Sequence, residues 1–130
     1  MKKAVFLLAM GLALLSAYSC EDTTVTEIYA MGINAFEGDG HAVSDLAAVT
    51  EYLKGKGAIV ESKVIEAKST DKADNEAIEL WDKNVKLIDE TEMALLVKGK
   101  FSFKYCLVRA VGVGSVDNPV LREKEYKFNQ

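Results

Sequence analysis

The chain has few of the residues on which most enzyme sites and cross-links depend. Its 130 residues include one histidine, two cysteines and one proline. Zinc sites usually take several histidine or cysteine ligands, and a serine hydrolase needs a histidine beside its nucleophile. With His41 as its single histidine, the chain is a poor candidate for a zinc site or a serine hydrolase site. No cofactor-binding motif stands in the chain, and we expect no cofactor.

Basic residues are also fewer than acidic residues in this chain. The chain has 16 lysines and arginines against 20 aspartates and glutamates, a formal net charge of −4. Its first nineteen residues hold two of the lysines and none of the acids, so the remainder is more acidic still. Nucleic-acid binding depends on basic side chains that neutralise phosphate. This balance therefore argues against nucleic acid, and against electrostatic docking on anionic lipid.

The first twenty residues differ in kind from the rest. Lys2 and Lys3 precede an apolar run over residues 4–15, and the next charged residue is Glu21. A basic end, an apolar stretch of about 7–15 residues and then small residues are typical of a secretory signal peptide. A spanning helix needs about 20 apolar residues. The run therefore predicts an exported protein rather than a transmembrane anchor.

Residues 16–20 resemble the lipobox of bacterial lipoproteins, with a small serine directly before Cys20. Ala17 and Tyr18 depart from the usual pattern, in which leucine and a small residue are commonest. The resemblance implies a signal peptide over residues 1–19, cleavage before Cys20 and diacylglycerol on its thiol. It also implies a lipid anchor in the membrane, with the protein in the cell envelope facing the periplasm or the cell surface.

A second interpretation of the same segment stays open. Residues 17–19 also satisfy the A-x-A-like rule of ordinary signal peptidase, which would cut the same bond and release an unlipidated periplasmic protein. In that case a Cys20–Cys106 disulfide is available in an oxidising compartment. With lipid on Cys20, Cys106 is a lone thiol. Cys106 lies in a strand-like run, and we expect it to be a small buried hydrophobe.

After a polar tether over residues 20–25, residues 26–130 read as a single domain. Alternating patterns predict strands over 26–36, 58–67, 100–113 and 122–128, and the apolar run 93–97 predicts one more. Helical spacing predicts helices over 42–54 and 71–88, the second with Trp81 in its apolar stripe. Two helices against one mostly antiparallel sheet of four to five strands make a two-layer sandwich, α+β in class. The helical crossovers are compatible with a relative of the ferredoxin-like fold.

One polar cluster stands in the first strand-to-helix loop. Glu37, Asp39 and His41 lie at alternate positions, and Asp45 follows. Carboxylate oxygens and an imidazole nitrogen can bind a divalent ion, so these four residues are candidate metal ligands. Their spacing matches no EF-hand loop. The alternative is a glycine-assisted turn whose acids suit the start of a helix.

The missing chemistry favours a binding module over an enzyme, and no catalytic residue is assigned. We expect an exported, tethered domain that binds another envelope protein or a small ligand through its sheet face or edge. One alternative is a small metal-dependent or hydrolytic enzyme centred on His41. Another is a structural or assembly subunit that uses its terminal strand for β-addition.

Overall fold

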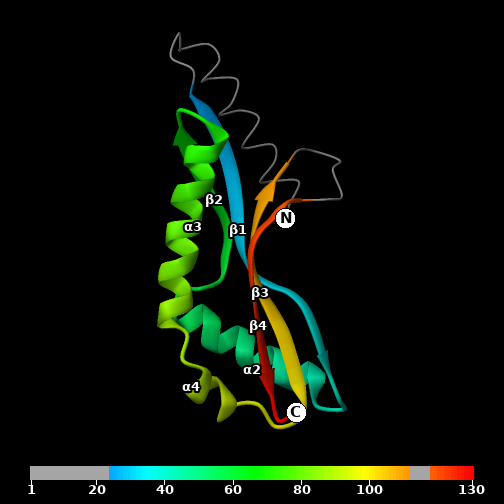
Figure 1. Cartoon of the computed structure of the whole chain (residues 1–130). Helices are drawn as coiled ribbons and strands as arrows, with labels where there is room; N and C mark the ends of the chain where they lie inside the picture. The colour runs from blue at the N-terminus through cyan, green and yellow to red at the C-terminus, as the bar shows by residue number, and fades with distance from the viewer. Residues whose placement is uncertain (1–23, 112–117) are drawn as a thin grey trace.

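The computed structural model describes residues 24–111 and 118–130. The elements are β1 (Val25–Gly38), α2 (Ala42–Gly55), β2 (Val60–Ala67), α3 (Thr70–Leu87), α4 (Glu90–Ala94), β3 (Phe101–Ala110) and β4 (Val120–Phe128). The strands form one antiparallel four-stranded sheet in the order β2-β1-β3-β4. Helix α3 covers one face of this sheet (Figure 1). The predicted two-layer α+β architecture is confirmed, and the ferredoxin-like relationship stays a prediction. The predicted signal peptide and Cys20 lie outside the described residues.

The core lies between the helices and one face of β3 and β4. Phe101, Phe103, Tyr105 and Leu107 alternate along β3 and are buried on the side of the helices. On β4, Tyr126 lies opposite Phe103 with ring centroids 5.1 Å apart. Burying one such side chain contributes about 1.5–3 kcal/mol. The strand residues of the core are Tyr29 and Met31 of β1, Ile65 of β2, Phe101, Phe103, Tyr105 and Leu107 of β3, and Tyr126 and Phe128 of β4.

Helix α3 packs on the sheet through small residues and one large aromatic ring. Its N-cap is Ser69, whose hydroxyl accepts a hydrogen bond from the backbone N–H of Lys72 at 3.2 Å. Ala73, Ala77 and Trp81 recur at helical spacing and are buried. The Trp81 ring stacks on Tyr105 with centroids 5.8 Å apart. The predicted packing of Trp81 in the core is confirmed.

The predicted strand at 93–97 is wrong, because the chain forms the short helix α4 there. The Asp89 carboxylate caps this helix by accepting the backbone N–H groups of Thr91 and Glu92. Such a cap satisfies N–H groups that a helix start leaves without partners. Met93 then reaches the core, whereas Leu95 is 84% exposed. A local cap therefore outweighed the apolar character of the run.

A partly buried polar contact joins α3 to the middle of the sheet. The Tyr29 hydroxyl donates to Asp74 Oδ1 at 2.6 Å, and the Arg109 guanidinium pairs with the other carboxylate oxygen. Tyr29 and Arg109 lie opposite each other on β1 and β3. Burial, and then the hydrogen bond to Asp74, raise the pKa of Tyr29 far above its ordinary value. Asp74 thereby ties the helix to both central strands.

We predict that Tyr29→Phe lowers the free energy of unfolding by about 1–2 kcal/mol, because it removes a buried hydrogen bond to a charged group. Urea denaturation measures this as a lower midpoint with an unchanged slope. A cycle with Asp74→Asn serves as the control. Groups that share one network are expected to show coupling of at least about 0.5 kcal/mol. Additive effects of the two substitutions would contradict this description of the contact.

Candidate functional site

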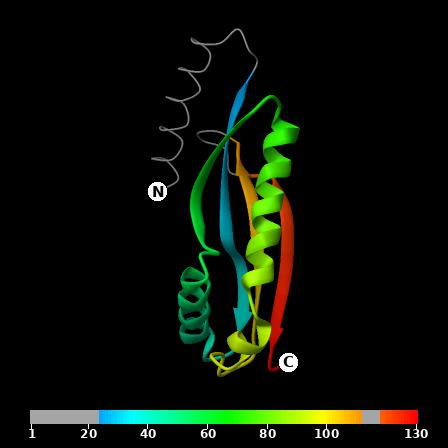
Figure 2. The same ribbon diagram turned by 90° about the vertical axis from the view of Figure 1, so that its left-hand side faces the viewer.

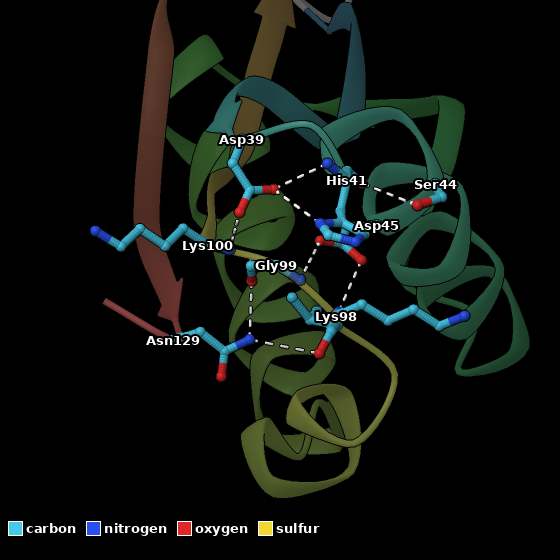
Figure 3. A network of polar contacts seen from close by, with 9 residues as sticks. Asp39, His41, Ser44, Asp45, Lys98, Gly99, Lys100 and Asn129 are labelled. Atoms are coloured by element: carbon cyan, nitrogen blue, oxygen red, sulfur yellow. Dashed lines mark hydrogen bonds and ion pairs between the residues drawn. The ribbon is translucent and has the colours of Figure 1, made fainter.

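Asp45 is a charged side chain in the buried interior of the described structure. It is 1% exposed and lies in the first turn of α2. Its Oδ1 accepts the backbone N–H of Lys98 at 2.9 Å, and its Oδ2 accepts that of Gly99 at 3.0 Å (Figure 3). A buried carboxylate is tolerated only when such partners replace water. Asp45 therefore joins α2 to the loop that leads into β3.

Asp39 also accepts a backbone hydrogen bond from the loop before β3. Its Oδ1 accepts the backbone N–H of His41 at 2.9 Å, and its Oδ2 accepts that of Lys100 at 3.1 Å. These bonds, that of His41 first, lower the pKa of the Asp39 carboxyl. Its stabilising effect is therefore present above the ordinary aspartate pKa and is lost as the pH falls through the lowered value. A Cβ on Gly99 would collide with the Asp39 carboxyl.

The end of β4 completes this set of contacts. The Asn129 side-chain amide donates to the carbonyl oxygens of Gly99 at 2.8 Å and Val97 at 3.4 Å. Figure 3 shows these side chains gathered around the 98–100 loop. We call Asp39, Asp45, Asn129 and the backbone of residues 98–100 the Asp39–Asp45 network. It closes one end of the sandwich by joining three segments that are far apart in the sequence.

In the structure, the four predicted metal ligands are not arranged as a coordination site. Asp39 and Asp45 both meet the 98–100 loop, and the exposed His41 Nδ1 lies 3.3 Å from Asp39 Oδ1. Glu37 is exposed on β1, opposite Ser102. Within residues 24–111 and 118–130, no group of three or more His, Cys, Asp or Glu side chains is arranged to hold a metal ion. The geometry thus favours the alternative interpretation, a turn with an acidic helix start.

His41 is placed as a helix cap and not beside a nucleophile. It is the N-cap residue of α2, and its ring contacts the Asp39 carboxylate. The nearby Ser44 hydroxyl donates to the His41 carbonyl oxygen at 3.0 Å and not to the ring. This arrangement offers none of the base–hydroxyl contact that a serine hydrolase uses.

A hollow of about 520 Å³ opens beside β1, and the sequence patterns did not indicate it. The pairing of β1 with β2 ends at Met31 opposite Val60, whereas the pairing of β1 with β3 continues to Gly38. Figure 2 shows β2 and α2 following one another along the same side of β1. The hollow lies where these three elements meet. Its lining comes from residues 30–34 and 36 of β1, from α2, from residues 59–61 at the start of β2 and from β3.

The lining of the hollow is mostly apolar. Among its side chains are Leu46 of α2, Ile59 and Val108, and the only charged one is Glu61. Cys106 contributes from β3, is 2% exposed and has a free thiol in the described structure. Burial raises the pKa of the Cys106 thiol to about 11, so it stays protonated near neutral pH. The prediction that Cys106 is a small buried hydrophobe is confirmed.

Comparison with protein-family models, with curated proteins and with solved structures found no match for this chain. Among the described residues, no helix has both the length and the apolar character that crossing a bilayer requires. The function is therefore inferred from the residues and geometry of this chain alone.

We predict that Asp45→Ala lowers the free energy of unfolding by about 3 kcal/mol. The substitution leaves the partly buried N–H of Lys98 and the buried N–H of Gly99 without an acceptor, at about 1–3 kcal/mol for each. Chemical denaturation measures the loss. Ser44→Ala, one residue earlier on the exposed side of α2, is the control and should change stability by less than about 0.5 kcal/mol. Equal effects of the two substitutions would refute a structural role for the Asp45 carboxylate.

Proposed function

We propose that this protein is an exported, non-catalytic binding module that holds its ligand or partner in the hollow beside β1. The observation that carries this proposal is the hollow itself. Its volume of about 520 Å³ falls within the range of about 300–1,000 Å³ that is common for ligand sites. Such sites usually combine an apolar lining with a few polar groups, here Asn34, Thr50 and Glu61.

The chemistry of the described side chains supports binding over catalysis. The carboxylate oxygens of Asp39 and Asp45 accept hydrogen bonds from backbone N–H groups. The thiol of Cys106 is buried, donates a hydrogen bond to the Glu123 carboxylate at 3.8 Å, and has its pKa raised to about 11 by burial, so it stays protonated. General acid–base and nucleophilic mechanisms need groups that are both reachable and activated. The described residues offer a shaped apolar surface instead.

The leader supports the export and anchoring part of the proposal. According to the proposal, Cys20 carries lipid, and the protein faces the periplasm or the cell surface. The sheet begins at Val25, so the tether from Cys20 spans at most about 18 Å when fully extended. In this arrangement the domain stays close to the membrane. The partner or ligand is then one that is present at the membrane surface of the cell envelope.

We predict that a photo-crosslinking amino acid placed at Thr50 captures the occupant of the hollow in intact cells. Thr50 lines the hollow, whereas its neighbour Glu51 is exposed and absent from the lining. Glu51 therefore carries the control crosslinker. Mass spectrometry of the adduct shows whether the occupant is a protein or a small molecule.

The Thr50 position is expected to give one discrete adduct that is missing at Glu51. A Leu46→Glu change in the same chain should remove it, because a carboxylate in the apolar hollow would have to lose its hydration. No adduct at Thr50, or the same adducts at both positions, would overturn the proposal.

We predict that a metabolically supplied fatty-acid probe labels this protein and that Cys20→Ser abolishes the label. Each acyl CH₂ buried in the bilayer contributes about 0.8 kcal/mol, so two or three chains hold the protein on the membrane. Cys106→Ser serves as the control and should keep the label. Wild-type protein that is unlabelled and released with the soluble periplasm would show that ordinary signal peptidase processes the chain.

A further inference from the structure

One side of β1 has a stretch without a strand partner in the described structure. On the β3 side, β1 is paired from Ile28 to Gly38. On the β2 side, its pairing stops at Met31. Residues 34–38 are exposed, although they are paired with β3. We call the β2-facing side of residues 32–38 the free edge of β1. Its backbone N–H and C=O groups are available for hydrogen bonds.

The free edge forms a wall of the hollow. The lining includes the five consecutive residues 30–34. Successive side chains of a strand point to opposite faces of the sheet. Five consecutive residues can therefore line one hollow only if it runs along the edge of the strand and meets the backbone itself. The hollow thus includes the place where the next strand of the sheet would lie, and it extends across β1 to Cys106 and Val108 of β3.

The free edge lacks the protection that the outer edges of this sheet carry. Natural edge strands commonly bear charged side chains that discourage pairing with other chains. β2 bears Glu61, Lys63 and Glu66, and residues 122–125 of β4 are all charged. Residues 32–36 of β1 carry no charge and no proline. Among the described strands, the outer edges of the sheet therefore carry charged side chains that discourage pairing, whereas residues 32–36 of β1 carry none.

We infer that the occupant of the hollow is an extended segment of another polypeptide, which pairs with the free edge of β1 as an added strand. This inference rests on the proposed function and names the class of partner. Main-chain hydrogen bonds to residues 32–38 supply affinity, as in other cases of β-strand addition. Leu46 and Ile59 receive apolar side chains of that segment.

The shape of the site favours a single segment over a second copy of this chain. The free edge is about 20 Å long at the usual rise per strand residue. The start of β2 and the helix α2 border the hollow at Val60 and at Leu46 and Thr50. A strand that belongs to a folded sheet brings its neighbouring strands with it, and these would meet the start of β2 and α2. One extended chain is narrow enough to enter.

The charges at the site indicate the composition of the segment. Glu61 lies in the lining, and Glu37 is exposed near the opposite end of the free edge. No lysine or arginine belongs to the lining. A segment with apolar residues in its middle and basic residues at its ends complements this pattern.

The test uses an acetylated heptapeptide, Lys-Thr-Val-Thr-Val-Thr-Lys, as the probe. At about 1 mM peptide, amide hydrogen exchange of the full mature protein is followed residue by residue by NMR. Alternate amides within residues 32–38 are expected to exchange at least tenfold more slowly, because in an added strand only every second N–H points to the new partner. The amides of β2 and β4 should be unchanged.

Two controls separate strand addition from other binding. The same peptide with every interior amide N-methylated keeps its side chains but cannot donate main-chain hydrogen bonds, and it should give no protection. Leu46→Glu should weaken binding of the unmodified peptide at least tenfold. Val43→Glu, on the same helix at a position 80% exposed, should bind it like the wild type.

Several results would overturn the inference. Equal protection by the N-methylated peptide, no protection at all, or protection on the outer edges of β2 or β4 would each do so. Protection of residues 32–38 that grows with protein concentration without peptide would instead show that a second copy occupies the edge. A small-molecule adduct at Thr50 would leave the proposed binding function intact while excluding a peptide occupant.

Discussion

The long antiparallel pairing of β1 with β3 is the interaction on which the rest of the structure depends. It runs from Ile28 opposite Ala110 to Gly38 opposite Phe101, with one irregularity near Asn34. Its register places the aromatic residues of β3 under α3 and leaves Cys106 on the other face of the sheet. Because β2 covers only the first half of β1, the same pairing also creates the free edge. Core and candidate site therefore follow from one strand pair.

The acids of the first loop show how a cluster of ligand-like residues can be structural. Asp39 and Asp45 lie close in sequence to His41, and these residue types can bind a divalent ion. In the structure their oxygens accept backbone N–H groups of the 98–100 loop. A loop that enters a central strand must satisfy its backbone groups wherever water is excluded. Two carboxylates meet that need here, and Asn129 adds two bonds from the chain's other end.

Much of the fold could be predicted from local signals, whereas the candidate site could not. Helical spacing over 71–88 predicted α3, and the alternation over 100–113 predicted β3 with Phe101, Phe103 and Tyr105 on one face. The apolar run over 93–97 predicted a strand, but the Asp89 cap begins the helix α4 directly before it. The hollow depends on where the β1–β2 pairing stops, which is a long-range property. No pattern within residues 26–36 or 58–67 encodes that end point.

The placement of the central strand pair has a kinetic consequence. β1 stands near the start of the described chain, and its partner β3 follows only after both long helices and β2. Closing so long a loop costs conformational entropy before any sheet contact compensates for it. During synthesis, α2 and α3 can form early, but β1 cannot pair with β3 until β3 has left the ribosome. The central strand pair, and with it most of the core, therefore forms only late in the translation of the chain.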